Sequence, residues 1–510
     1  MTRTTRFVVL TATLCEIFAG CATGERPKVP TTVESPPPPG PVTRKSHPGD
    51  PEQLPFSSAN PIALTALREG LDLLENARVD DARQQFKVAA ELDPGFASAI
   101  ALWGSTIPGP EGAKKIDDAV AMAASLPPAE RTHILYRQAL HAKEHPRAAD
   151  LAKKLVDLAP KNARAHLLLG SSLRDIQRTA DAEAEYTTAL TLNPDLAQAW
   201  NNLAYLEFDQ GKLAEAIAHF RRYAELRPKE PNPQDSLGEA LMGAGKLEEA
   251  EAAFTRALTI DYKFYESWEG VAFARLYRGD WKGGYEALDR MRERSQTQQG
   301  RLDTDRDLAW VLLADGRGAD ALKTIDNFEL AATRTGDAAN ALVALYDRAW
   351  IANELGKGPL ALKSLQTLYD RVAKDKSAAS DGGRFQLVAD ARALECSIDA
   401  RLGKPADAEK ALDALTAAVG TSAESDIAGR VAYARGEVQL ARGDAAGAAK
   451  TMKGCLATDD WCAFARADAE ERAGDRATAA ADRERLAKLF HRDPVYFYVW
   501  RRLTGPSGAR

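Results

Sequence analysis

The middle of the chain repeats itself at a fixed interval of 34 residues. Pro160, Pro194 and Pro228 are each separated by that interval. Two further sets keep the same step: the small residues Ala182, Ala216 and Ala250, and the large rings Tyr186, Phe220 and Phe254. A unit of this length is one small motif that cannot bury its apolar face alone, so neighbouring units must stack. The repeat therefore predicts a stacked array rather than one compact core.

Each unit has the pattern of two helices. Residues 180–190, for example, combine good helix formers with apolar residues at helical spacing. The proline at the end of a unit stops its second helix, because proline lacks the backbone N–H that would continue the hydrogen-bond ladder. Aromatic residues make up only 7% of the chain and alanine is abundant throughout. The fold class predicted from these features is all-α.

The best-defined unit carries a set of residues typical of a known repeat. Its members are Trp200, Leu203, Ala204, Ala216, Phe220, Ala224 and Pro228. This set resembles the tetratricopeptide repeat, with Ala204 where that family usually has Gly and Glu207 where Tyr is common. The resemblance implies an α-α superhelix, which is a solenoid of antiparallel helical hairpins with a long concave groove.

A weaker form of the repeat continues to the end of the chain. A turn Gly is followed five residues later by Ala at Gly316 and Ala321, Gly356 and Ala361, Gly403 and Ala408, Gly443 and Ala448, and Gly474 and Ala479. We therefore expect an N-terminal array over residues 62–292, a degenerate C-terminal array over 303–510, and ten to twelve hairpins in all. Residues 292–305 are a polar break between the arrays, residues 374–384 form a loop, and residues 486–503 form a helix that caps the open end.

The N-terminus has the features of a signal peptide followed by a tether. Residues 7–20 are apolar but too few to span a bilayer, and Arg3 and Arg6 precede them. Residues 17–21 resemble the lipobox of bacterial lipoproteins, which implies lipidation at Cys21; Cys15 is a poorer candidate because Leu14 precedes it. Residues 21–61 are rich in proline and predict a disordered linker.

The lipobox resemblance also implies a location. No Asp follows Cys21, which in this class favours the bacterial outer membrane, with the protein facing the periplasm or, as the alternative, the cell surface. An ordinary cleaved signal is one alternative to lipidation. An uncleaved segment, on a cytoplasmic or inner-membrane interaction protein, is another.

Few residues in the sequence suggest catalytic chemistry. The stretch from His141 to His145 matches the H-x-x-E-H pattern of zinc peptidases, but Pro146 and the turn position argue against two imidazoles held on one helix. Residues 242–246 resemble a phosphate loop only faintly, and no nucleophile elbow or dinucleotide-binding turn is present. A net charge of -6 argues against nucleic acid. We therefore expect no enzymatic activity, catalytic residue, metal, cofactor or small-molecule substrate.

Three cysteines remain after the signal peptide and Cys21. Cys455 and Cys462 would flank one turn between helices, so in an oxidising periplasm they predict a disulfide, with two separate buried thiols as the alternative. Cys396 falls at a close-packed position and is expected in the core.

The remaining candidate site is the groove that the repeat resemblance implies. Its first-helix positions include Arg164, Arg174, Asn201, Asn202, Tyr205 and Phe208. Asn and Arg can hydrogen-bond a peptide backbone or a carboxylate, and aromatic rings add contact area. The carboxylate-clamp pattern of the family is incomplete, because Leu167 and Asn201 stand where the clamp has Lys. The sequence predicts a protein or peptide partner in the cell envelope and a membrane anchor through the N-terminal lipid.

These features together favour a lipid-anchored interaction scaffold. Similar lipoproteins assist the assembly of secretion, pilus, gliding, polysaccharide-export or barrel-assembly complexes. An adaptor that regulates a peptidoglycan hydrolase is the first alternative, and a zinc-dependent peptidase using residues 141–145 is the second.

Overall fold

A computed structural model describes residues 56–75, 78–295, 297–374, 381–420, 425–455 and 459–505. The predicted signal peptide, Cys21 and most of the linker lie outside these residues. The chain divides into two compact units, at Pro228 and Lys229, and each is considered by itself. We call the described residues up to Pro228 the N-terminal unit and those from Lys229 the C-terminal unit.

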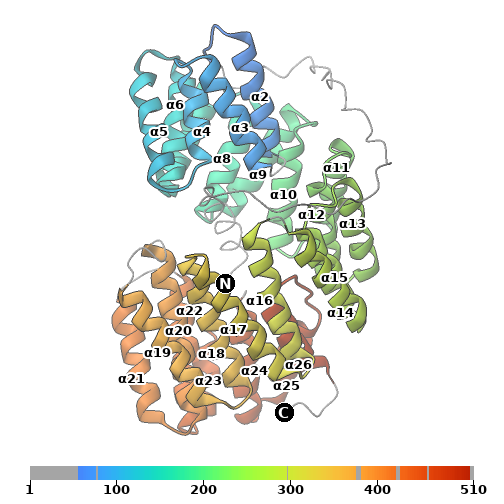
Figure 1. The fold of residues 1–510 in the computed structure, drawn as a ribbon, viewed down its shortest axis with the longest axis vertical. Coiled ribbons are helices and arrows are strands. Elements are labelled where there is room, and N and C mark those ends of the chain that lie inside the picture. The colour runs from blue at the N-terminus through green and yellow to red at the C-terminus, as the bar shows by residue number, and fades with distance from the viewer. Residues whose placement is uncertain are drawn as a thin grey trace, which may run out of the picture. The chain divides into compact units, whose positions relative to one another are not determined.

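The N-terminal unit consists of five helical hairpins, drawn from blue to green in Figure 1. Its helices are α2 (Pro61–Glu75), α3 (Val79–Leu92), α4 (Ala97–Ser105), α5 (Gly109–Met122), the short 3-10 helix η1 (Ala123–Ser125), α6 (Pro128–His141), α7 (His145–Leu158), α8 (Ala163–Asp175), α9 (Thr179–Leu192), α10 (Ala197–Asp209) and α11 (Leu213–Leu226). The two helices of a hairpin pack together, and the second also packs on the first helix of the next hairpin.

The C-terminal unit has seven hairpins and one further helix in its described residues. Its helices are α12 (Asn232–Gly243), α13 (Leu247–Ile260), α14 (Glu266–Tyr277), α15 (Trp281–Arg294), α16 (Gln298–Ala314), α17 (Gly318–Arg334), α18 (Ala338–Glu354), α19 (Gly358–Lys374), α20 (Asp381–Arg401), α21 (Pro405–Val419), α22 (Ser425–Ala441), α23 (Ala445–Met452), α24 (Asp460–Arg472), α25 (Arg476–Ala487) and α26 (Pro494–Thr504). The described residues contain helices and no strand, so the all-α hairpin solenoid is confirmed.

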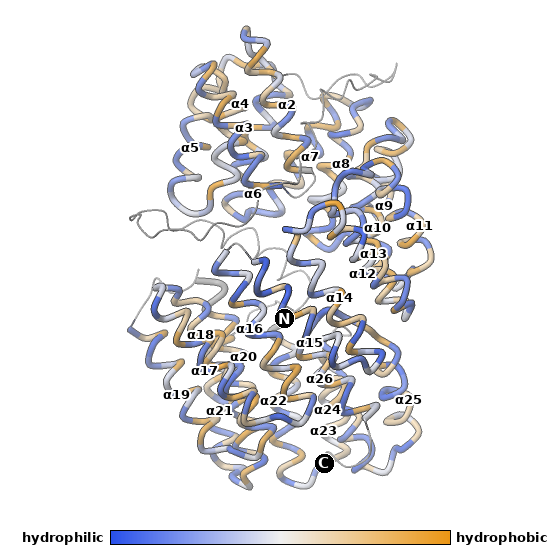
Figure 2. Tube along the Cα trace, turned by 45° about the vertical axis from the view of Figure 1, so that its right-hand side comes forward, coloured by the Kyte–Doolittle hydropathy of each residue, from blue (hydrophilic) through white to orange (hydrophobic). Residues whose placement is uncertain are grey.

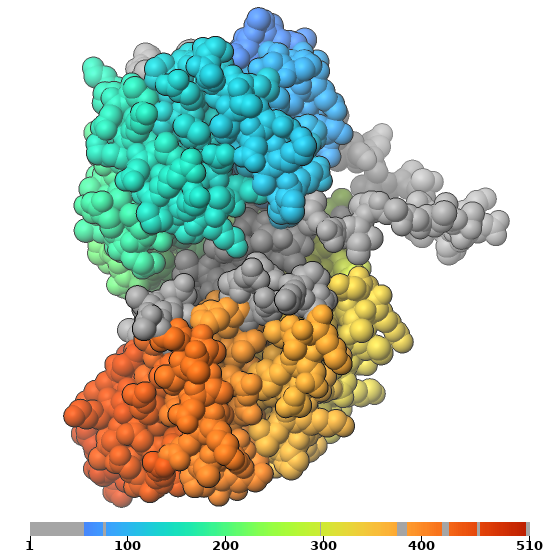
Figure 3. Space-filling model, turned by 90° about the vertical axis from the view of Figure 1, so that its left-hand side faces the viewer, coloured from blue at the N-terminus to red at the C-terminus, as the bar shows by residue number. Residues whose placement is uncertain are grey.

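Hydrophobic and hydrophilic residues alternate along the helices (Figure 2). The small residues predicted at the close-packed position are buried: Ala182, Ala216, Ala250, Ala321, Ala361, Ala408, Ala448 and Ala479 are at most 1% exposed. A large ring of the second helix lies over the first helix; a Cβ on Gly238 would come within 2.7 Å of the Phe254 ring. Such contacts leave little free space between paired helices. Figure 3 shows the outer surface of the units in space-filling form.

The turns between paired helices depend on one backbone conformation. The glycines at these turns all have positive φ: Gly211, Gly245, Gly316, Gly356, Gly403, Gly443 and Gly474. At the same turn of earlier hairpins stand Lys143 (φ 58°) and Gln177 (φ 62°), whose side chains make this left-handed conformation costly.

We expect Gln177→Gly to stabilise the N-terminal unit by about 0.5–1 kcal/mol, because Gly removes the steric cost of the left-handed turn. Gly211→Gln, at the equivalent turn one repeat later, should destabilise the unit by a similar amount. Urea unfolding of the two variants measures both effects. A stability loss in Gln177→Gly would show that the Gln side chain contributes more than its backbone strain costs.

The polar stretch 292–305 is not the break that the sequence predicted. Helix α15 continues to Arg294 and α16 begins at Gln298. The charged residues pair across the short connection, with Arg292 Nε 3.3 Å from Asp305 Oδ1, so their polarity does not interrupt the helices. The compact units divide instead at residue 228, inside the expected array 62–292. Residues 374–384 are partly helical as well, since α20 begins at Asp381.

The repeat weakens in the C-terminal unit because its helices lengthen. Helices α16 to α19 each have 17 residues, against 12 to 14 in α12 to α15. The turn glycines Gly316 and Gly356 are therefore 40 residues apart, and a search for a 34-residue period loses the pattern.

Candidate peptide-binding groove

The predicted groove residues lie on the first helices of two consecutive hairpins in the N-terminal unit. Arg164 and Arg174 belong to α8, and the other four belong to α10. On α10, Asn201, Tyr205 and Phe208 are separated by four and three residues, which places them on one side of the helix. The sequence thus predicted a connected strip on α10.

A hydrogen-bond network joins this strip to the neighbouring hairpin. Asn202 Nδ2 donates to Ser171 Oγ of α8 at 3.0 Å, and Gln198 Nε2 donates to Asn202 Oδ1 at 2.7 Å. The Tyr186 hydroxyl of α9 donates to the same Ser171 Oγ at 3.3 Å. Burial raises the pKa of Tyr186, so its hydroxyl stays protonated as a donor. The network holds α8, α9 and α10 in register at the groove.

Asn201 has an unusual environment within this strip. Its residue is 7% exposed, and among the described residues its Oδ1 has no hydrogen-bond partner. Gln198 Oε1, one turn earlier on α10, is buried and unpartnered in the same part of the chain. A buried carbonyl without a donor costs about 1–3 kcal/mol, which a ligand N–H would recover. The two amides can therefore accept hydrogen bonds from a peptide backbone.

The aromatic groove residues also contribute to the hydrophobic core. Tyr205 meets Phe220 edge to face, with ring centres 4.8 Å apart, and Phe208 is 6% exposed. Arg164 and Arg174 are half-buried on α8. Among the predicted groove residues, Asn202 is joined by the structure to a hydrogen-bond network, whose other members are Ser171, Gln198 and Tyr186. The sequence analysis did not predict this network.

The H-x-x-E-H stretch is divided between two helices. His141 ends α6, His145 begins α7, and Lys143 makes the left-handed turn between them. The imidazoles have separate partners: His141 Nε2 lies 3.2 Å from Gly109 O, and His145 Nδ1 lies 3.7 Å from Asp175. Within the described ranges no three His, Cys, Asp or Glu residues lie where they could share a metal ion.

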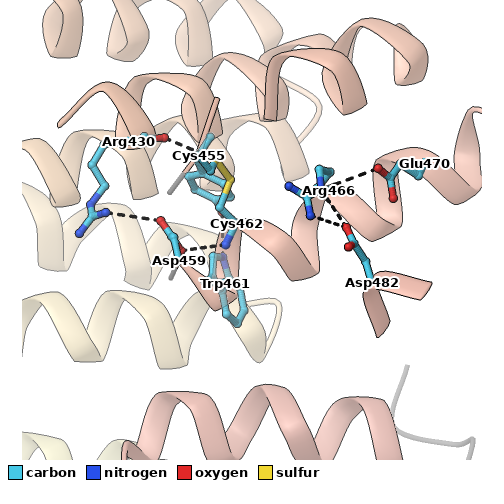
Figure 4. The surroundings of a disulfide bond; sticks show 10 residues. Arg430, Cys455, Asp459, Trp461, Cys462, Arg466, Glu470 and Asp482 are labelled. Carbon is cyan, nitrogen blue, oxygen red and sulfur yellow. Dashed lines mark hydrogen bonds and ion pairs between the residues drawn. A yellow bond between two sulfur atoms is a disulfide. The ribbon is translucent and has the colours of Figure 1, made fainter. Parts of the chain in front are cut away.

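A disulfide joins Cys455 and Cys462 across the turn from α23 to α24, with Cα atoms 6.4 Å apart (Figure 4). Asp459 caps α24 by accepting a hydrogen bond from the Cys462 amide at 2.9 Å, and Arg430 lies 3.4 Å from the same carboxylate. Cys396 is fully buried on α20, and burial together with neighbouring carboxylates raises the pKa of its thiol to about 12. That thiol is a core group rather than a nucleophile.

We expect Cys455 and Cys462 of the purified protein to resist alkylation after denaturation without reductant. Reduction before alkylation should add two labelled thiols, and Cys455→Ser should leave one extra free thiol at Cys462. Peptide mass spectrometry measures both. Full labelling without reductant would mean that the two thiols are separate in the cell.

A second strip of polar residues lies on α12 of the C-terminal unit. Asp235 and Glu239 lie one turn apart on α12, at positions equivalent to Asn201 and Tyr205 one repeat earlier. Both carboxylates contact Arg492 near the C-terminus, at 3.1 and 3.2 Å. Burial raises the pKa of Asp235, and the Arg492 charge opposes that effect. The cluster of aromatic residues after Arg492 was the available signal, and the sequence analysis interpreted it as a cap.

No helix of the described residues is long and apolar enough to cross a membrane.

Two family models of the tetratricopeptide repeat match the chain. One matches residues 167–231 and 398–458, and the other residues 235–264. These ranges fall in both compact units and include every candidate groove residue on α8 and α10 except Arg164. Together with the hairpin architecture, they show that the chain contains tetratricopeptide repeats.

Several known proteins share parts of the array. Protein O-mannosyl-transferase TMTC1 of Homo sapiens is 30% identical over 168 residues, which are 30% of this chain and 18% of that protein. Cellulose synthase operon protein C of Xanthomonas axonopodis pv. citri is 26% identical over 254 residues, or 39% of this chain and 16% of that protein. The chain therefore spans less than a fifth of the length of these relatives.

Solved structures with similar hairpins are small. A crystal structure of MamA is 19% identical with a TM-score of 0.29, and covers 31% of this chain and 93% of its own. YrrB, described as a tetratricopeptide-repeat protein with an unusual peptide-binding site, is 16% identical with a TM-score of 0.29, and covers 38% of this chain and 97% of its own.

The relatives correct one expectation. The sequence analysis excluded an enzymatic role, and this exclusion is wrong, because the matched proteins TMTC1 and TMTC3 are named protein O-mannosyl-transferases. Those matches cover 30% and 28% of this chain and 18% of each transferase. Repeat arrays of this kind therefore occur in proteins that carry an enzyme name.

Proposed function

We propose that the protein is an interaction scaffold and that the α8 and α10 side of its N-terminal unit binds a segment of a partner protein. The observation that carries this proposal is Asn201, a buried side chain whose carbonyl has no hydrogen-bond partner among the described residues. Gln198 supplies a second such carbonyl, and Asn202 is held in place through Ser171. The N–H groups of a bound peptide backbone would supply hydrogen-bond donors to these two carbonyl oxygens.

The proposed setting is the bacterial cell envelope. Lipidation at Cys21 would anchor the mature chain to the outer membrane, and the linker to residue 61 would hold the repeats away from the bilayer. The tetratricopeptide repeats support the interaction role, and the lipobox resemblance supports the anchor. Within this setting we favour assistance in assembling an envelope complex over regulation of a peptidoglycan hydrolase.

Substitution of Cys21 tests the anchor. We expect Cys21→Ser to shift the protein from the membrane fraction to the soluble fraction and to abolish the mass added by acyl chains. Cys15→Ser is the matched control and should leave both unchanged. A full-length, unacylated mass for the wild-type protein would contradict the anchor and favour an uncleaved segment.

In-cell crosslinking followed by mass spectrometry tests the groove. We expect the native chain to capture an envelope protein, and Asn201→Ala with Asn202→Ala to reduce that capture at least about tenfold. The control variant is Thr187→Ala with Thr188→Ala, two exposed residues on α9. Unchanged capture by the Asn variant would reject the α10 strip as the binding site. The identity of the captured protein then distinguishes an assembly complex from a peptidoglycan hydrolase.

A further inference from the structure

The inner side of the C-terminal unit is occupied by the end of the same chain. Helix α26 packs against α16, and the two lie side by side in Figure 1 although 196 residues separate their starts at Gln298 and Pro494. Helix α26 also packs on α24 and α25 of the last hairpin, where the sequence predicted a cap. Tyr496, Phe497, Tyr498 and Val499 of α26 are at most 8% exposed, so the helix buries these residues against several neighbouring helices.

Arg492, just before α26, binds the acidic strip on α12. Its guanidinium lies 3.1 Å from one Asp235 oxygen and 3.2 Å from Glu239 Oε2, and it stands 5.3 Å from the centre of the Phe254 ring. Asp235 also accepts a hydrogen bond from the Ser267 hydroxyl of α14 at 2.7 Å. Two carboxylates one helical turn apart, over an aromatic face, form a site selective for a guanidinium group.

Tyr277 of α14 contacts both the backbone and the aromatic rings of residues 490–500. Its hydroxyl donates to His491 O at 3.0 Å and accepts from His491 N at 3.3 Å. The Tyr277 ring lies 5.1 Å from Phe490 and from Phe497, and 4.9 Å from Trp500, in edge-to-face contacts. Burial raises the pKa of Tyr277 well above its usual value, so the hydroxyl remains neutral.

The far end of the segment is held by a second acidic group. Glu354, the last residue of α18, accepts hydrogen bonds from the Tyr498 hydroxyl at 2.8 Å and from Arg502 at 2.6 Å. The inner surface thus presents carboxylates at both ends of an aromatic platform, and the segment presents arginines at matching positions. Charge complementarity of this kind gives specificity for one partner chemistry.

We propose that this inner surface, formed by α12, α14, α16 and α18, is a second binding surface whose partner is a protein helix with an arginine ahead of a run of aromatic residues. Residues 489–503 occupy the surface until such a helix replaces them. Helix α26 contacts α16, α24 and α25, and each of these helices also packs on its own hairpin partner, so release of α26 leaves those hairpin contacts in place. Asp235 keeps its Ser267 hydrogen bond and gains water when Arg492 leaves. This proposal does not depend on the α10 groove.

Peptide binding to the full-length chain tests the proposal. The probe is a fluorescent synthetic peptide of residues 489–505, and the opened variant is Arg492→Glu with Arg502→Glu. We expect the opened variant to bind the peptide at least about tenfold more tightly than the wild type, because its own segment no longer competes. The control carries the same charge change at exposed sites, Arg78→Glu with Arg290→Glu, and should bind like the wild type.

A second substitution places the peptide on the surface. Adding Asp235→Asn and Glu239→Gln to the opened variant should weaken peptide binding at least about tenfold, and a peptide with Arg492→Ala should show the same loss on the opened variant. Equal binding by wild-type and opened chains, or no effect of the Asp235 and Glu239 changes, would overturn the proposal. So would an absence of binding to an opened variant whose circular dichroism matches the wild type.

Hydrogen exchange on the wild-type chain covers the case in which the opened variant does not fold. We expect backbone amides of α26 to exchange through local opening, at least about tenfold faster than those of α14 and α16. Protection of α26 equal to that of α14 would make it a permanent part of the core and would overturn the proposal.

Discussion

Tyr186→Ala is expected to lower the free energy of unfolding of the N-terminal unit by about 3–5 kcal/mol. The Tyr186 ring is fully buried and belongs to the core that joins α6 to α10. It packs on Gly170, where a Cβ would come within 2.7 Å of the ring, so no neighbouring side chain can fill the space that it leaves. The substitution also removes the hydroxyl that donates to Ser171, and the groove network on α8 and α10 should lose its register. Urea unfolding followed by circular dichroism measures the change.

Tyr186→Phe is the matched control, because it keeps the ring and removes only the hydroxyl. We expect a loss of about 1 kcal/mol from this variant. Thr187→Ala, at the exposed neighbouring position, should change stability by less than about 0.5 kcal/mol. If Tyr186→Ala and Tyr186→Phe were equally unstable, the hydrogen bond rather than the packing of the ring would dominate.

Glu354→Ala is expected to destabilise the C-terminal unit by about 2–3 kcal/mol. The carboxylate is 2% exposed and receives Arg401 of α20 and Arg502 of α26, both at 2.6 Å. Without it, the guanidinium groups of Arg401 and Arg502, which are partly exposed to water, lose their common partner, and α18 loses these polar links to α20 and α26. The magnitude stays below that of a fully buried ion pair because both arginines keep contact with water. Thermal and urea unfolding measure the loss.

The contribution of Glu354 should depend on pH. Burial alone would raise the pKa of this carboxyl, but the charges of Arg401 and Arg502 outweigh burial and lower the pKa below 4.5. A carboxyl with a lowered pKa stabilises the folded state above its unfolded value, and that contribution disappears as pH falls through the folded value. The difference in stability between the wild type and Glu354→Gln should therefore be constant above about pH 5 and shrink below about pH 4. A difference that grew on acidification would contradict the assigned ion pairs.

Much of the fold could be predicted because the hairpin is a local structure. A turn such as Gly316 is followed five residues later by Ala321, and both positions behave as the spacing predicted: the glycine has positive φ and the alanine is fully buried. Steric limits on one backbone angle and on one helix crossing act within a few residues, so they leave a direct trace in the sequence. Helical spacing is local in the same way, so the sequence could assign four groove residues to one helix, α10: Asn201, Asn202, Tyr205 and Phe208.

Other features depend on residues far apart in the chain. The partners of Asn202 come from a neighbouring hairpin, and Arg492 meets Asp235 across 257 residues. The polar residues 292–305 suggested a break, yet the Arg292 and Asp305 pair keeps α15 and α16 close together. Polarity alone does not show whether a charge faces water or another charge.

The sequence by itself determined the helical hairpin, its turns and its close-packed positions, because these follow from local sterics and from apolar residues repeated at a fixed interval. Tertiary structure decided which groove positions lack a partner and which are filled by the chain itself. Whether a groove is filled by another part of the chain depends on the stacking angles between many successive hairpins. These angles decide which charged residues come together. Only the folded C-terminal unit therefore shows that Arg492, just before α26, pairs with Asp235 of α12, and that Arg502 of α26 pairs with Glu354 of α18.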